Sequence, residues 1–113
     1  MPIQNWSENI LLVELHDDPA LTDDLNGLID QLREHPQVDV VADFTNVNYL
    51  NSSNIAKLLK VRKIVMVNNR RHMKLCAINA QVWGVFLITG LDKLFEFADN
   101  VSLGLAAIQI DEE

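Results

Sequence analysis

The chain has 113 residues, of which 49% are hydrophobic and 22% are charged, and its formal net charge is -7. These values are typical of a globular domain, and they exclude a disordered chain and a fibrous architecture. The acidic excess argues against general affinity for nucleic acids, because phosphate binding depends on lysine and arginine.

The first part of the chain predicts a strand, a helix and a second strand. The run from Ile10 to Leu15 predicts a strand, and Thr22 is expected to cap a helix that ends near His35. That helix is indicated by apolar residues at helical spacing, namely Leu25, Leu28, Ile29 and Leu32. The β-branched run from Val38 to Phe44 predicts a buried strand. This order of elements indicates a right-handed crossover and a partly parallel sheet.

A second helix is expected to begin in the cap-favouring cluster from Asn51 to Asn54. Lys57, Lys60 and Ile64 fall opposite its apolar face, whereas Arg62 lies within the apolar arc. We therefore expect that the Arg62 side chain extends to the edge or that the helix is distorted there. A basic band begins in this helix and comprises Lys57, Lys60, Arg62, Lys63, Arg70, Arg71 and Lys74. Such a band is either a solvated helix face or a surface that recognises an acidic partner.

The last part of the chain predicts one more strand and two more helices. The strand runs from Met73 to Ile78, and its Cys76 is expected to be a buried residue without chemistry or disulfide. Apolar spacing indicates the third helix: Val82, Val85, Phe86 and Thr89. Gly90 is expected to end this helix, and a short apolar edge follows it. Asn100 is expected to cap a last helix that runs to about Ile110.

The residues that could carry catalysis or hold a cofactor form no readable motif. The histidines His16, His35 and His72 are far apart and lack the spacing of metal ligands. The glycines form no phosphate-binding loop, and Ser52 and Ser53 lack the frame of a nucleophile elbow. We therefore expect no metal, no cofactor and no enzymatic activity, although distant side chains can still converge on an active site.

The sequence contains no apolar stretch that approaches the ~20 residues needed to cross a bilayer. Its N-terminus also lacks a basic segment followed by an apolar core, the pattern of a secretory signal. We therefore expect no membrane insertion and a cytoplasmic location.

The stretch from Val40 to Leu59 resembles the signature of the STAS family. In that signature an apolar strand is followed by D-x-S-x-V-x-x-x-D-S-x-G-hydrophobic and an amphipathic helix. The residues that fit are Asp43, Thr45, Val47, Ser52 and Ile55. A second family-like segment runs from Leu87 to Phe95, and the order of elements matches over nearly the whole chain. The resemblance implies a single STAS domain over residues 1–113, with an α/β fold. Its sheet would be mixed and mostly parallel, with four to five strands and about four helices packed mainly on one face.

The resemblance also implies a bacterial anti-sigma factor antagonist, a regulator of transcription and signal transduction. Such a protein binds an anti-sigma factor serine kinase and frees a sigma factor, and phosphorylation switches it. Carried over to this chain, the phosphate acceptor is Ser52, with Ser53 as second choice; a plain helix cap is the simpler role for Ser52. The expected partner-binding residues are Asn51, Ser52, Ser53, Asn54, Lys57 and Lys60. The oligomeric state stays open.

Two residues beside Ser52 depart from the family pattern. Asn51 stands where the family has aspartate, and Asn54 stands where it has glycine. Asn51 keeps a capping oxygen but lacks the charge, and Asn54 adds a side chain near the expected docking surface. These departures favour an alternative, a non-phosphorylated STAS scaffold in a sensor complex or an accessory subunit of a lipid transporter.

Overall fold

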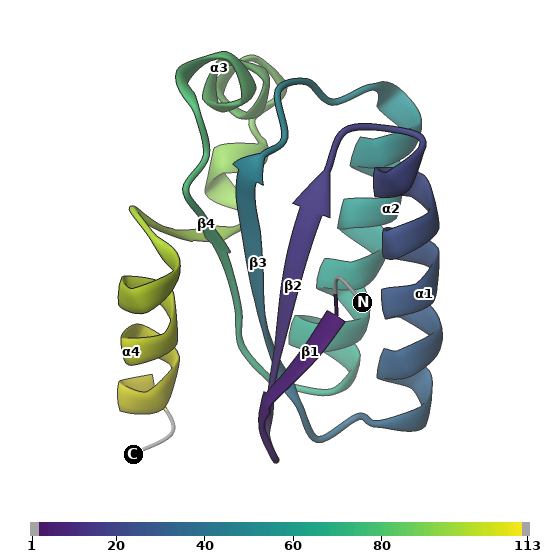
Figure 1. The fold of residues 1–113 in the computed structure, drawn as a ribbon, viewed down its shortest axis with the longest axis vertical. Helices are drawn as coiled ribbons and strands as arrows, with labels where there is room; N and C mark the ends of the chain where they lie inside the picture. Colours follow the sequence, from purple (N-terminus) through teal and green to yellow (C-terminus); the bar gives the residue numbers. More distant parts are fainter. Residues whose placement is uncertain (1–2, 112–113) are drawn as a thin grey trace.

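The computed structural model describes residues 3–111, which form one sheet with helices on both of its faces (Figure 1). The strands of this range are β1 (Ile3–Ser7), β2 (Ile10–His16), β3 (Asp39–Asn46), β4 (Met73–Cys76) and β5 (Glu96–Ala98). Its helices are α1 (Ala20–Glu34), α2 (Ser52–Arg62), α3 (Ala80–Thr89) and α4 (Val101–Asp111), with a π-helix η1 (Lys63–Asn68) and a 3₁₀-helix η2 (Leu91–Lys93). The strand order is β1-β2-β3-β4-β5, and only β1 runs antiparallel to its neighbour. The predicted α/β fold class is confirmed.

Strand β1 was not predicted from the sequence. It forms a hairpin with β2, in which Ile3 pairs with Val13, and four of its five residues are exposed. The strand therefore lacks the apolar alternation that marks a half-buried strand, and its position comes from backbone pairing with β2. The second strand of the hairpin contains the predicted run from Ile10 to Leu15.

Three of the four α-helices contribute to one core, on the face of the sheet that α1 and α2 cover. The buried side chains that these helices supply include Leu21, Leu25, Leu28 and Leu32 of α1, Leu58 and Val61 of α2, and Val82 and Phe86 of α3. Helix α4 covers the opposite face, where Ile108 packs with Ile10, Val41 and Cys76. Figure 1 shows α4 on the far side of the strands from α1 and α2. The helices thus pack mainly on one face, as predicted.

Helix α4 approaches the sheet closely at Gly104. A Cβ atom at this position would collide with the Sγ atom of Cys76 on β4, so the absence of a side chain lets the helix sit there. The cap predicted for α4 is confirmed, since the Leu103 amide donates to Asn100 Oδ1 over 2.9 Å. The predicted burial of Cys76 is also confirmed: the residue is fully buried, and burial raises the pKa of its thiol to about 11.

The predicted start of α1 was wrong. The helix begins at Ala20, and Thr22 lies inside its first turn instead of preceding it. The side chain of Asp18 supplies the capping oxygen, because its Oδ1 accepts hydrogen bonds from the Thr22 amide (2.9 Å) and hydroxyl (2.7 Å). A carboxylate is a stronger acceptor than a hydroxyl, and this explains why Asp18 takes the role assigned to Thr22.

Both expectations for Arg62 are met. Its Nε donates to the Leu94 carbonyl oxygen over 2.8 Å, so the side chain extends away from the core. From Lys63 the helix continues as η1, whose wider π turns carry Val65 into the core. Gly90 ends α3 with a left-handed φ of 76°, as predicted. Within residues 3–111, no helix combines the length and apolar character needed to cross a membrane.

Candidate functional site

The candidate site lies where the parallel strands end. Three loops meet there: β2–α1, β3–α2 and β4–α3. The first two are joined by Asp17, which accepts bonds from the Asn48 amide (2.8 Å) and side chain (2.9 Å). The β4–α3 loop is joined to the β3–α2 loop by Asn79, whose Nδ2 donates to the Val47 carbonyl over 3.1 Å. Open α/β sheets commonly bind their ligands at this edge.

Ser52 and Ser53 are the first two residues of α2, and both are exposed. Neither hydroxyl makes a hydrogen bond with any residue that the structure describes, and the same holds for their backbone N–H groups. The helix dipole adds partial positive charge at this end. The site therefore presents two free hydroxyls beside two free donors, an arrangement suited to an oxyanion.

The rest of the first turn is closed by a reciprocal capping box. The Asn54 amide donates to Asn51 Oδ1 over 2.8 Å, and the Asn51 amide donates to Asn54 Oδ1 over 3.1 Å. Both side-chain amides also donate to Asp18 Oδ2, each over 3.0 Å. One carboxylate from the β2–α1 loop thus fixes the start of α2.

Asn54 was predicted to lie on the partner-binding surface, but its side chain is fully buried. It holds Asn51 and Asp18 in place from the inside, and the exposed surface consists of Asn51, Ser52 and Ser53. A buried amide needs hydrogen-bond partners, and these partners are present. The sequence signal for this role was the spacing Asn51-x-x-Asn54, which matches a capping box with amides in place of hydroxyl and carboxyl groups.

The two aspartates of the β2–α1 loop are stabilised as anions. Hydrogen bonds from Asn48 lower the pKa of Asp17, and the hydroxyl bond from Thr22, followed by the Asn54 bond, lowers the pKa of Asp18. Two negative charges therefore stand in the loop that is bonded to the start of α2.

These lowered pKa values predict a loss of stability in acid. The hydrogen bonds contribute fully above the ordinary carboxyl pKa of 3.8, and the contribution falls as the pH drops through the lower folded values. We expect Asp18→Asn to lower the urea midpoint at neutral pH and to flatten its decline below about pH 4. Asp30→Asn, at an exposed position of α1, is the control and should keep the decline of the native chain. If the urea midpoint of Asp18→Asn fell below about pH 4 as steeply as that of the native chain, the lowered pKa of Asp18 would not be a source of stability.

The lysines predicted to accompany Ser52 lie on a different side of α2. Lys57 and Lys60 follow Ser53 at helical spacings of four and seven residues, so these three side chains share one stripe. Ser52 lies one residue, about 100° of helical rotation, away from that stripe. Lys57 is half-buried, and Lys60 lines a pocket with residues of α1. The structure therefore does not bring the two lysines together with Ser52.

The signature residues at the end of β3 have a structural role. Asp43 Oδ1 accepts bonds from the Thr45 amide (3.0 Å) and hydroxyl (2.6 Å), which closes the turn that leads to the candidate site. Val47, in the next loop, is fully buried in the main core. A family model for the STAS domain matches residues 15–104, a range that contains the three loops of the candidate site. The chain belongs to the STAS family.

Solved structures of other STAS proteins share the fold of this domain. A protein from Thermotoga maritima, described as a putative anti-sigma factor antagonist, has a TM-score of 0.81 at 13% identity, with 96% of this chain and 93% of that chain covered. An anti-sigma-factor antagonist (STAS) domain protein from Planctomyces limnophilus has a TM-score of 0.79 at 15% identity, with coverages of 95% and 97%. Among curated protein sequences, none matches the chain.

The Bacillus anti-sigma factor antagonist SpoIIAA is also similar, and it has been solved with and without its phosphate. The phosphorylated form has a TM-score of 0.64 at 15% identity, with 86% of this chain and 89% of that chain covered. The unphosphorylated form has a TM-score of 0.68 at 12% identity, with coverages of 93% and 93%. At identities this low, the structural similarity establishes a common fold only. Function has to be argued from the residues of the site.

The sequence analysis did not predict an exposed apolar surface that lies on α3 and directly after η2 of this STAS domain. Ile88 is 88% exposed, Leu87 51% and Leu94 39%. Hydrogen bonds tie the segment to the β3–α2 loop, where Asn79 donates to the Val47 carbonyl, and to the end of α2, where Arg62 donates to the Leu94 carbonyl. The sequence signal for this surface was the absence of charged residues from α3. The helix therefore has more apolar side chains than its buried face can hold. We call these three side chains the α3 apolar surface.

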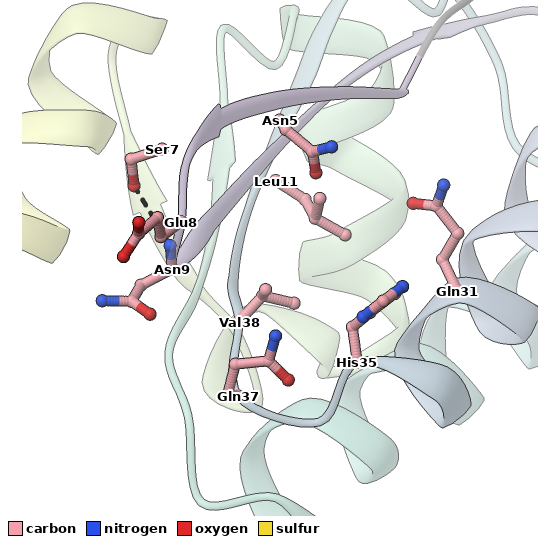
Figure 2. Close-up of a pocket in the computed structure, with 9 residues that line it drawn as sticks. All are labelled: Asn5, Ser7, Glu8, Asn9, Leu11, Gln31, His35, Gln37 and Val38. Carbon is pink, nitrogen blue, oxygen red and sulfur yellow. Dashed lines mark hydrogen bonds between the residues drawn. The ribbon is translucent and has the colours of Figure 1, made fainter.

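A polar pocket of about 630 Å³ lies at the other edge of the STAS sheet, between the β1–β2 hairpin and the end of α1 (Figure 2). Its polar side chains include Asn5, Asn9, Gln31, Gln37 and His35. Figure 2 shows them arranged around the apolar side chains of Leu11 and Val38. Glu8 adds a carboxylate to the lining, and carboxamides both donate and accept, so this pocket suits a polar ligand that offers hydrogen-bond donors. Its residues are scattered in the sequence, which explains why no motif indicated it.

Among residues 3–111, no cluster of histidine, cysteine or acidic side chains has the geometry of a metal site. The histidine nearest to the candidate site in topology is His16, at the end of β2. Its Nε2 lies 3.4 Å from Glu14 Oε1 and 3.4 Å from Asn46 Nδ2. It makes no hydrogen bond to either serine among the described contacts, so the arrangement of an activated serine nucleophile is not formed there.

Proposed function

We propose that this STAS domain is an anti-sigma factor antagonist that acts in the cytoplasm. It binds an anti-sigma factor serine kinase, and phosphorylation of Ser52 controls that binding. The observation that carries the proposal is the exposed, unbonded Ser52 hydroxyl at the first position of α2. The existence of SpoIIAA, an antagonist of similar fold, in phosphorylated and unphosphorylated forms supports it.

The local chemistry supports a charge switch at Ser52. A phosphoserine adds a charge of about -1.5 to -2. The free N–H groups of Ser52 and Ser53 can donate to its oxygens, so α2 tolerates the group. The neighbouring Asp17 and Asp18 are held as anions, so the phosphate enlarges an acidic surface. Phosphorylation then acts at the interface, through desolvation and repulsion of the partner, while the fold is retained.

The α3 apolar surface supports a protein partner. Protein interfaces bury apolar anchors at their centre and place polar groups at their rim. Here Leu87 and Ile88 offer the anchors, and the start of α2 with Ser52 offers a polar rim that a kinase can modify. We propose a binding role without enzymatic activity, which agrees with a serine that lacks an activating histidine bond among the described residues.

The proposal is tested with an anti-sigma factor serine kinase from the same organism, supplied with ATP. We expect intact-mass spectrometry to show one added phosphate on the native chain and on Ser53→Ala, and none on Ser52→Ala. Unmodified protein should bind the kinase, and the phosphorylated form should bind roughly 30-fold more weakly, the equivalent of about 2 kcal/mol. Absence of both binding and phosphate transfer would refute the proposal. Modification of Ser52→Ala but not of Ser53→Ala would move the switch to Ser53.

A second candidate function is a non-phosphorylated scaffold in a sensor complex or in a lipid transporter. The capping box favours it, since Asn51 and Asn54 are both engaged with Asp18 and hold the site rigidly. A scaffold of this kind predicts stable partner binding that neither ATP nor Ser52→Asp changes.

A further inference from the structure

A pocket of about 470 Å³ lies between the end of α1 and the junction of α2 with η1. Arg33 reaches it from α1, and Lys60 and Lys63 reach it from the other side. Leu32 and Ile64 add apolar lining. The volume falls within the usual range for sites that bind small molecules. The pocket lies eleven residues along α2 from Ser52, about 16 Å at the rise of an α-helix.

The positive charge of this pocket is not neutralised by the protein. Other members of the basic band have partners elsewhere: Arg71 pairs with Asp39 and Lys74 with Glu96. Arg33, Lys60 and Lys63 make no ion pair with any of residues 3–111, and no carboxylate lines the pocket. Three unpaired cations around one cavity are unexpected in a chain whose net charge is -7. They create a local field that attracts anions.

Two further observations mark the same place. The Asn69 side-chain Nδ2, in the pocket lining, is buried and has no hydrogen-bond partner. A buried donor of this kind destabilises the fold while it stays unsatisfied, so a ligand oxygen that reaches it would remove that penalty. The lining also includes the π-helix η1, and the next residue after Asn69, Arg70, has a positive φ of 55°. Strained backbone and π turns concentrate at functional sites.

We propose that this pocket binds a small molecule that carries a phosphate monoester. The phosphate lies among Arg33, Lys60 and Lys63, and the Asn69 amide becomes a donor to it when the ligand is bound. Arginine suits such an oxyanion because its guanidinium donates two parallel hydrogen bonds. Ile64, which is only partly buried, contacts the apolar part of the ligand. The site is independent of the Ser52 switch, since it involves the other end of α2.

The test is a titration of the whole protein, labelled with ¹⁵N, with phenyl phosphate and with inorganic phosphate. We expect phenyl phosphate to shift the Asn69 side-chain amide signal and the backbone signals of Lys63 and Ile64. The double variant Lys60→Gln/Lys63→Gln should weaken binding at least roughly tenfold. Lys93→Gln removes an exposed lysine on η2 and should leave the affinity unchanged.

Inorganic phosphate distinguishes the parts of the site. It should shift Asn69 with lower affinity than phenyl phosphate, because it lacks the apolar group. The absence of any shift at roughly 10 mM phenyl phosphate would overturn the proposal, and so would equal affinity in the double variant. An acidic peptide that displaces phenyl phosphate and binds more tightly would overturn it in favour of a peptide-binding surface. If the double variant unfolds, Arg33→Gln applies the same test from α1.

Discussion

The Ile88→Asp variant is expected to bind the kinase partner roughly 30-fold more weakly, a loss of about 2 kcal/mol or more. Ile88 is 88% exposed, so the native fold does not depend on its contacts. An aspartate at the centre of an apolar interface must lose its hydration without gaining a partner, and this cost falls entirely on the complex. Isothermal titration calorimetry of the two proteins measures the effect.

The chain offers a matched control for this experiment. Ile110 of α4 is 69% exposed, and α4 covers the opposite face of the sheet. Ile110→Asp therefore makes the same chemical change far from the α3 apolar surface, and it should leave the affinity within twofold, a difference of about 0.4 kcal/mol. Both variants should keep the unfolding midpoint of the native chain, since surface substitutions usually change stability by no more than about 0.5 kcal/mol. Equal affinities for the two variants would show that α3 lies outside the interface.

Local patterns in the sequence were sufficient to predict most of the fold. The helix starts at Asn51 and Asn100 and the end at Gly90 are set by single residues whose capping chemistry acts within one turn. The conflict at Arg62 was also visible, because one charge in an apolar arc breaks the helical period. Such features depend on neighbours in the chain, and a reading of the sequence reaches them directly.

What could not be predicted depends on contacts between distant segments. Asp18 replaces Thr22 as the cap of α1, and it also bonds Asn51 and Asn54, more than thirty residues away. Strand β1 exists because β2 offers it a free edge, whereas its own residues have no strand pattern. The candidate site was therefore correctly placed at the start of α2, but the burial of Asn54 depends on a loop that the motif does not contain.

The basic band shows the same limit. It was predicted as a single feature, either a solvated face or a partner surface, because its members are close in sequence. In the structure they have separate roles: Lys74 pairs with Glu96, Arg62 bonds the Leu94 carbonyl, and Lys60 lines a pocket with Arg33 of α1. Sequence proximity does not show which cations find partners, because the partners come from other elements.

Among the residues of the basic band, Arg71 is the one whose substitution should lower the free energy of unfolding most. We expect Arg71→Met to lower the free energy of unfolding by roughly 3–5 kcal/mol, because it leaves the buried Asp39 carboxylate without its cation. Asp39 has no exposed surface, and its Oδ2 lies 3.1 Å from Arg71 Nη2. Its Oδ1 accepts from the His72 amide over 2.8 Å, so the carboxylate also joins the starts of β3 and β4. Urea denaturation followed by circular dichroism measures the loss.

The neighbouring Arg70 supplies the control for this prediction. It is exposed, and Arg70→Met removes the same charge and adds the same side chain at the next position. We expect its effect to stay within about 0.5 kcal/mol. The double variant Asp39→Asn/Arg71→Met should lose less free energy of unfolding than the two single variants lose together. The reason is that a neutral amide at position 39 does not need the guanidinium as a counter-charge. Strict additivity, or a loss below about 1 kcal/mol in Arg71→Met, would mean that water already solvates the Asp39 carboxylate.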